Sequence, residues 1–228
     1  MPLILLIESS TETCSVGLSE NGRLLDACEA EGPYEHTARI TLLIDELTRG
    51  AGRTLKAVDA VAVSIGPGSF TALRVGLSTA KGICYALGKP LIAVDTLAAL
   101  AGAAVRAYNR DTAVYCPMID ARRMEVYTAF YTASLETLEE AHALIVEGDS
   151  FDRFLATGRE VVLFGNGAEK CRQVLTAPGV CYLDQVCTAE MLARPANDQF
   201  AAGDFADLAY TEPFYLKPPN ITTPKSRL

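Results

Sequence analysis

The chain has 228 residues, of which half are hydrophobic and none is tryptophan, and its formal net charge is -8. This length fits one large domain or two small ones and allows a sizeable core. The sequence pI near 4.9 predicts a surface that repels polyanions, which argues against unaided nucleic-acid binding.

The first hundred residues predict alternating strands and helices. A buried strand "LILLIES" precedes the alternating strand "CSVGLSE", the turn residues Asn21 and Gly22, and a third strand "RLLDACEAE". In "HTARITLLIDELTRG", aliphatic residues recur at helical spacing. A strand at 58–65, a helix at about 71–87, the strand "PLIAV" and the helix "TLAALAGAAVRAY" complete the order β-β-β-α-β-α-β-α.

The stretch "SIGPGSFTALRVG" connects the fourth predicted strand to its helix through two glycines. This arrangement aims backbone N–H groups at an anion in phosphate-binding proteins. Gly66, Pro67 and Gly68 also form the tight turn that any strand-to-helix connection needs. We expect the turn mainly to orient the helix, with a weak anion contact at Gly66, Gly68 and Ser69.

The second half repeats the plan of the first. "VYCPMIDARRMEVYTAFY" predicts a strand that ends in an acid, a polar bend and a second strand, so that Glu8 and Asp120 match. "VVLFGNGAEKCRQVL" predicts a strand, Gly-x-Gly and a helix. Residues 133–160 fit only mixed loops and helix. The pattern indicates a duplicated fold, with one lobe at 1–108 and a reduced one at 109–228.

Cysteine usage and the apolar segments bear on the compartment. The seven cysteines are never spaced as Cys-x-x-Cys, which predicts reduced thiols and no zinc site. The opening "MPLILLIESS" has no positively charged region, and nowhere do 18 apolar residues run together. We therefore expect a cytoplasmic protein that neither enters nor crosses a membrane.

Two similar lobes in this order indicate the α/β actin-like ATPase (ASKHA, ribonuclease H-like) fold. The chain resembles the TsaB (YeaZ) family of bacterial tRNA threonylcarbamoyladenosine biosynthesis proteins in "ILLIESSTETCSVGL", "EHTARITLLIDELTRGAG", "AVSIGPGSFTALRVGLSTAKG", "IDARRMEVYTAFY" and "EPFYLK". The resemblance implies a non-catalytic subunit that pairs with TsaD through first-lobe helices, joins TsaE in a ternary complex and forms a homodimer when alone. It also implies that tRNA is met only within the complex.

The resemblance carries an expectation about nucleotide. In the actin-like pattern the first strand ends Asp-x-Gly, where the acid orders the metal-bound nucleotide and the glycine lets a phosphate approach the backbone. Here Glu8, Ser9 and Ser10 take these positions. We expect no tightly bound cofactor and at most a weak ATP or ADP contact at the partner interface, made by these residues and the glycine turn.

The resemblance also bears on metal binding and catalysis. The related TsaD proteins carry His-x-x-x-His after their fifth strand, which places two imidazoles on one helix face. Thr96 and Leu100 stand at those positions here, and the only histidines are His36 and His142. We therefore expect no metal site and no catalytic residue.

The helix after the glycine turn carries a stripe of mostly small side chains, which permit close helix packing. Its members are Ala72, Gly76, Thr79 or Ala80, Ile83 and Ala86. We predict a partner interface at this stripe, with His36 and Arg39 of the first helix beside it. Contact with the chain's own first helix is the alternative that periodicity leaves open.

Two other classes of function remain open. One is an active enzyme of the same fold, an ATP-dependent phosphotransferase or a peptidase, which would depend on Glu8 or Asp120. The other is a direct RNA-binding module, for which the tail offers Lys217, Lys225 and Arg227.

Overall fold

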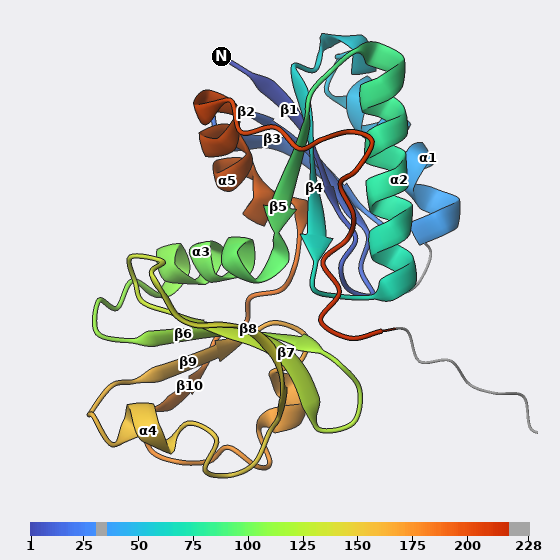
Figure 1. Cartoon of the computed structure of the whole chain (residues 1–228). Coiled ribbons are helices and arrows are strands. Elements are labelled where there is room, and N and C mark those ends of the chain that lie inside the picture. The colour runs from blue at the N-terminus through green and yellow to red at the C-terminus, as the bar shows by residue number, and fades with distance from the viewer. Residues whose placement is uncertain (31–35, 219–228) are drawn as a thin grey trace, which may run out of the picture.

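The computed structural model describes residues 1–30 and 36–218, and these form two lobes that each contain a five-stranded sheet (Figure 1). The first sheet has the order β3-β2-β1-β4-β5, with β2 antiparallel to both of its neighbours and β4 parallel to both of its own. Its strands are β1 Leu3–Glu8, β2 Ser15–Glu20, β3 Arg23–Glu29, β4 Ala60–Gly66 and β5 Leu91–Asp95.

The second sheet repeats this topology. In the order β8-β7-β6-β9-β10, its antiparallel and parallel pairs match those of the first sheet one for one. The predicted duplication is confirmed, and Glu8 and Asp120 end the equivalent strands β1 and β6. The strands are β6 Val114–Asp120, β7 Glu125–Tyr131, β8 Thr137–Ile145, β9 Val161–Phe164 and β10 Val180–Tyr182.

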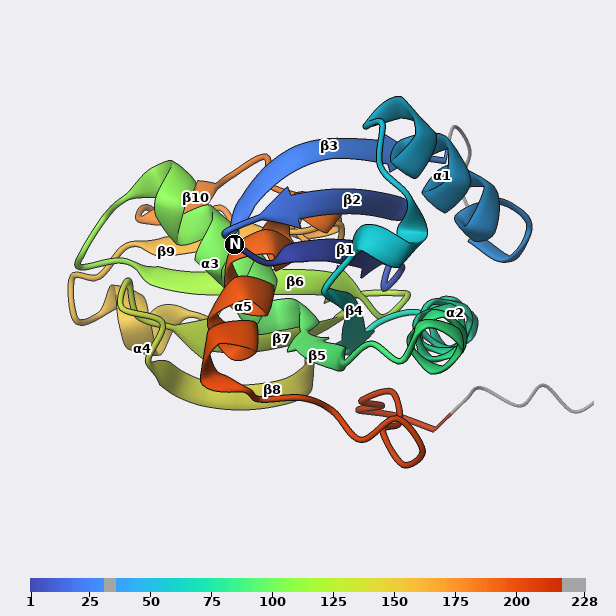
Figure 2. The same ribbon diagram turned by 90° about the horizontal axis from the view of Figure 1, so that it is seen from above.

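Helices cover both faces of the first sheet (Figures 1 and 2). On one face α1 and α2 pack with Leu5 and Ile7, and on the other α3 and α5 pack with Ile4 and Leu6. Because both faces of β1 are buried, its sequence is apolar almost throughout. The helices are α1 His36–Gly50, α2 Phe70–Leu87, α3 Thr96–Tyr108, α4 Asp152–Leu155 and α5 Ala189–Ala202.

The second lobe is reduced, as the sequence indicates. In place of α1 and α2 it has the four-residue α4 and a 3-10 turn at Glu169–Cys171. The helix predicted after Gly167 is therefore wrong, since the backbone bonds there are mostly of the i to i+3 kind and form only a short 3-10 turn. Residues 133–160 instead contain β8, an edge strand whose acidic side chains obscured its alternation.

The end of the chain returns to the first lobe, which corrects the prediction that 109–228 form one unit. The apolar face of α5 packs against β1 and β5. Beyond it, Ala206 pairs with Leu91 and covers the edge of β5. Helix α5, which contains Pro195, is not among the elements predicted from the sequence. In the described part of the chain no helix has the length and apolar character to cross a membrane.

Candidate functional site

A cleft of about 380 Å³ lies between the lobes, where β1 and β6 end. Ligands of α/β proteins commonly bind beyond the carboxyl ends of the strands. The first lobe contributes the residues after β1 and the start of α2, and the second contributes the β6–β7 hairpin and Asn166. The C-terminal segment 214–218 forms the remaining wall.

Glu8 lies beneath this cleft and is fully buried. Its Oε1 accepts hydrogen bonds from the Ser10 backbone N–H at 2.6 Å and from the Ser10 hydroxyl at 2.5 Å. Burial raises the pKa of Glu8 to about 7, although the bonds from Ser10 oppose the shift. Oε2 has no hydrogen-bond partner among the described residues. The carboxyl is therefore held at its own strand end by Ser10 and does not itself line the cleft.

Both glycines of the turn serve packing within the chain. A Cβ on Gly68 would lie 2.2 Å from the carbonyl oxygen of Ser10, which accepts a bond of 2.7 Å from the Ser69 N–H. Gly66 has φ 115°, and a Cβ there would lie 2.6 Å from the carbonyl oxygen of Phe214. The space beside each glycine, which a phosphate would need in order to approach the backbone, is thus filled by the chain's own carbonyl groups.

The residues predicted to contact an anion separate into two groups. Ser10, Gly68 and Ser69 line the cleft. Glu8, Ser9 and Gly66 are buried below it. Ser9 donates from its hydroxyl to the Ala72 carbonyl at 3.0 Å, which ties the end of β1 to α2.

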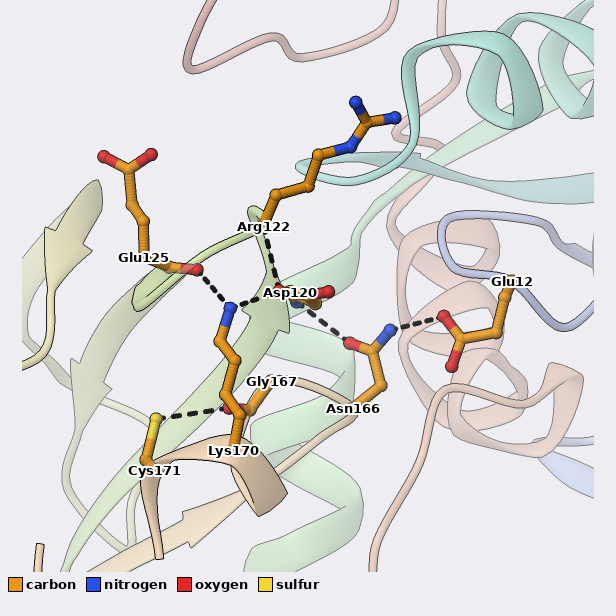
Figure 3. A network of polar contacts seen from close by, with 8 residues as sticks. All are labelled: Glu12, Asp120, Arg122, Glu125, Asn166, Gly167, Lys170 and Cys171. Atoms are coloured by element: carbon orange, nitrogen blue, oxygen red, sulfur yellow. Dashed lines mark hydrogen bonds and ion pairs between the residues drawn. The ribbon is translucent and has the colours of Figure 1, made fainter. Parts of the chain in front are cut away.

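The wall from the second lobe is a polar network centred on Asp120 (Figure 3). Asp120 accepts a bond of 2.9 Å from the Arg122 N–H and forms an ion pair with Lys170. Its own N–H donates to the Asn166 amide oxygen at 3.0 Å, and the Asn166 amide nitrogen donates to Glu12 at 2.6 Å. This chain of contacts links the two lobes. Of these residues, only Asp120 was predicted from the sequence as a possible site residue, although Asn166 is the middle residue of the Gly-x-Gly motif after β9.

The C-terminal segment crosses from one lobe to the other. The Phe214 N–H donates to the Ile65 carbonyl at 2.7 Å. The ring of Tyr215 lies 4.7 Å from that of Phe70, and its hydroxyl accepts a bond of 3.0 Å from Arg74 Nε.

The basic residues of the tail were predicted as a cluster. Lys217 instead forms an ion pair with Glu125 of the second lobe. Lys225 and Arg227 lie outside the described residues.

The predicted partner stripe is corrected by the packing of α2. Ala72, Gly76 and Ala80 face the first sheet and are buried. A Cβ on Gly76 would lie 2.1 Å from the Ser9 hydroxyl oxygen. The stripe is therefore an internal helix-to-sheet contact, because small side chains there let α2 approach β1.

The other predicted interface positions differ in exposure. Ile83 is half-buried against the core that α1 and α2 share, and Arg39 is half-buried on α1. Periodicity left open whether the stripe contacts a partner or the chain's own first helix, and Ile83 packs within the chain, in the core shared by α1 and α2. The side chain of His36 lies outside the described part.

The positions compared with the histidines of TsaD have structural roles. The Thr96 hydroxyl accepts a bond of 3.0 Å from the Gly66 N–H, and Leu100 is fully buried in the core between the lobes. Within residues 1–30 and 36–218, no group of three or more His, Cys, Asp or Glu side chains is placed to hold a metal ion.

Comparisons with known proteins add to this geometry. The family model described as "TsaD: tRNA N6-adenosine threonylcarbamoyltransferase" matches residues 33–211. The tRNA threonylcarbamoyladenosine biosynthesis protein TsaB of Escherichia coli K12 is 32% identical over 223 residues, which cover 94% of each chain. YeaZ from Pseudomonas aeruginosa superposes with a TM-score of 0.78 at 28% identity, over 95% of this chain and 100% of that one.

A more distant structural match concerns the fold alone. The polyphosphate/ATP-glucomannokinase of Arthrobacter sp. strain KM superposes with a TM-score of 0.51 at 13% identity, over 89% of this chain and 100% of the kinase chain. The duplicated sheet topology is thus that of the predicted actin-like (ASKHA) fold, which this kinase shares.

Proposed function

This chain belongs to the TsaB (YeaZ) family of tRNA threonylcarbamoyladenosine biosynthesis proteins, and from that premise we propose that it is the non-catalytic partner subunit of TsaD. In this role it supports formation of N6-threonylcarbamoyladenosine next to the anticodon of tRNA. The observation that carries the proposal is the closed glycine turn, where Gly68 packs on the Ser10 backbone above the buried Glu8. A glycine turn that packs on its own chain, next to a carboxyl that does not line the cleft, is suited to a scaffold and poorly suited to ATP turnover.

The proposed contact with TsaD lies on the solvent face of α2. Ser78 and Gly82 are exposed there at helical spacing, and Tyr85 is 83% exposed. Nothing lies within 4 Å of a Cβ built on Gly82, so a second helix could approach closely. An exposed tyrosine beside small residues is typical of an interface anchor. Arg39 and His36 remain proposed neighbours on α1.

The same surface accounts for the other proposed partners. A homodimer of the isolated chain would use it in place of TsaD, and TsaE would join only the heterodimer. We place any ATP or ADP contact at the heterodimer interface, with low affinity for the isolated chain.

Co-purification with TsaD from the same organism tests the proposal. Wild-type chain should elute with TsaD and restore threonylcarbamoyladenosine formation in a reconstituted tRNA assay. Gly82→Arg should abolish both while its melting temperature stays unchanged, since the position is open to solvent. Gly148→Arg is the matched control, because Gly148 is also exposed but lies in the second lobe.

The outcomes distinguish an interface on α2 from one elsewhere, and a non-catalytic subunit from an active enzyme. Co-elution of Gly82→Arg with TsaD and normal modification would move the interface off α2. A wild-type chain that does not bind TsaD, or that hydrolyses ATP alone faster than about one turnover per second, would contradict the non-catalytic role.

A further inference from the structure

Two consecutive arginines in the β6–β7 hairpin have a backbone conformation that favours glycine or asparagine. Arg122 has φ 71° and Arg123 has φ 51°. In the β2–β3 hairpin of the same chain, Asn21 and Gly22 meet the same demand with φ 53° and 73°. Positive φ is unfavourable for long side chains, and residues held there gather at functional sites. The arginines therefore call for a functional reason.

Neither guanidinium is used within the described part of the chain. The acids nearest the hairpin already have cationic partners, since Asp120 pairs with Lys170 and Glu125 pairs with Lys217. No hydrogen bond or ion pair of either arginine side chain occurs among residues 1–30 and 36–218, and both residues are exposed. Figure 3 shows the Arg122 side chain extending away from the carboxylate of Asp120.

The chemistry of the pair favours phosphate. Guanidinium groups bind phosphate oxygens through two parallel N–H bonds, and they keep their charge at every physiological pH. Only Arg122 lines the cleft, while both arginines lie in the exposed hairpin turn. This placement suits an extended polyanion that crosses the surface better than a nucleotide enclosed in the cleft.

Resting on the proposed function, we infer that the Arg122–Arg123 turn binds backbone phosphates of the substrate tRNA when the chain is in its complex with TsaD. The net charge of -8 makes the isolated chain a poor RNA ligand. Within the complex, two unpaired cations at a fixed turn supply a local contact that needs no basic surface over the whole chain. The contact positions the RNA and carries no sequence preference.

The test is fluorescence anisotropy of a labelled tRNA transcript with the purified heterodimer, titrated at several salt concentrations. Arg122→Asn/Arg123→Gly should weaken binding about 10-fold at physiological salt and lower the slope of log K against log salt by about 1 to 2. Because the change relieves positive φ, the melting temperature should stay equal or rise by about 2–4 °C. Arg122→Lys/Arg123→Lys should keep most of the slope.

The charge control is Arg23→Gln/Arg110→Gln, which removes two exposed cations, one at the first residue of β3 and one before β6, far in the fold from the hairpin turn. It should leave affinity and slope near wild type. Unchanged tRNA binding by Arg122→Asn/Arg123→Gly would overturn the inference, as would a loss confined to ATP binding, which would assign the turn to nucleotide. Failure of the wild-type chain to elute with TsaD appears before RNA is added and counts against the proposed function instead.

Discussion

Gly76→Ala offers the sharpest measurement of how α2 packs on the first sheet. The ideal Cβ would lie 2.1 Å from the Ser9 hydroxyl oxygen and 3.2 Å from the Ser9 Cβ. The hydroxyl must therefore rotate away and give up its bond of 3.0 Å to the Ala72 carbonyl. Both residues are buried, so neither water nor a surface rearrangement can relieve the contact.

Three effects set the magnitude. A buried hydroxyl without a partner costs about 1–3 kcal/mol. Crowding in a packed core costs about 1–3 kcal/mol. Alanine favours the helix over glycine by about 1 kcal/mol, which offsets part of the loss. Together these terms lower the free energy of unfolding by about 1–5 kcal/mol.

Ser9→Ala should rescue this variant, because it removes the oxygen that collides and leaves only the milder contact between the two Cβ atoms. Urea denaturation followed by circular dichroism measures all four members of the cycle, with an expected coupling above about 1 kcal/mol. Gly82→Ala is the matched control on the open face of α2, and it should gain about 0.5–1 kcal/mol. A Gly76→Ala chain as stable as wild type, or no rescue by Ser9→Ala, would refute the packing argument.

Two further predictions concern the buried acid and the C-terminal segment. Because burial raises the pKa of Glu8 from 4.5 to about 7, the folded state binds the carboxyl proton more tightly than the unfolded chain does. The protonated Glu8 therefore stabilises the fold fully below pH 4.5, and this stabilisation is lost as the pH rises through about 7. Between these pH values, the unfolding free energy of the wild type should fall by about 3 kcal/mol relative to that of Glu8→Gln, as measured by denaturation at a series of pH values. If the unfolding free energies of the two proteins changed with pH in parallel, Glu8 would not titrate in this range. Tyr215→Ala should lower the unfolding free energy by about 1–2 kcal/mol, because it loses the contact with Phe70 and the bond from Arg74. Tyr210→Ala changes a tyrosine that is 83% exposed shortly before this segment, and it should change the unfolding free energy little. If calorimetry showed the same loss for both variants, the contact of the Tyr215 ring would not be the cause.

The first lobe could be predicted because its local signals agree with its packing. Asn21 and Gly22 mark the β2–β3 hairpin, and the apolar run of β1 fits a strand buried on both faces. The glycine turn separates β4 from α2 as expected. In the second lobe these signals fade, since α4 and the 3-10 turn at Glu169–Cys171 are too short for a helical period to develop.

The direction that α2 faces could not be read from its periodicity. Gly76 and Gly82 each have small residues near them at helical spacing, yet Gly76 is buried and Gly82 is exposed. Periodicity shows that a face exists, but only the position of Ser9 shows which one packs on the sheet. The stripe at Gly76, predicted as a partner interface, is for this reason an internal contact with the sheet.

The network across the cleft was also out of reach of local pattern. Asn166 meets Glu12 over a separation of 154 residues, and Lys217 meets Glu125 over 92. Such pairs depend on how the lobes are placed and on the return of the chain after α5. A strand end or a turn predicts where a polar residue lies, but not which distant residue completes its contacts.

The two copies of the acid show how the duplicated fold has divided its roles. Glu8 and Asp120 end equivalent strands and each accepts a bond from the N–H two residues later, yet the first is fully buried and the side chain of the second is 42% exposed. A buried carboxyl keeps its charge only at a cost, as the raised pKa of Glu8 shows, whereas Asp120 lies open to solvent and forms an ion pair with Lys170. The first lobe uses Glu8 and the two glycines of its turn for internal packing, and the basic side chains that line the cleft are Arg122 and Lys217, of which Lys217 is paired with Glu125. An anionic partner that enters the cleft would therefore meet the β6–β7 hairpin at Arg122. This is the residue that the hairpin holds at a positive φ of 71°, which gives the unfavourable backbone conformation a functional reason.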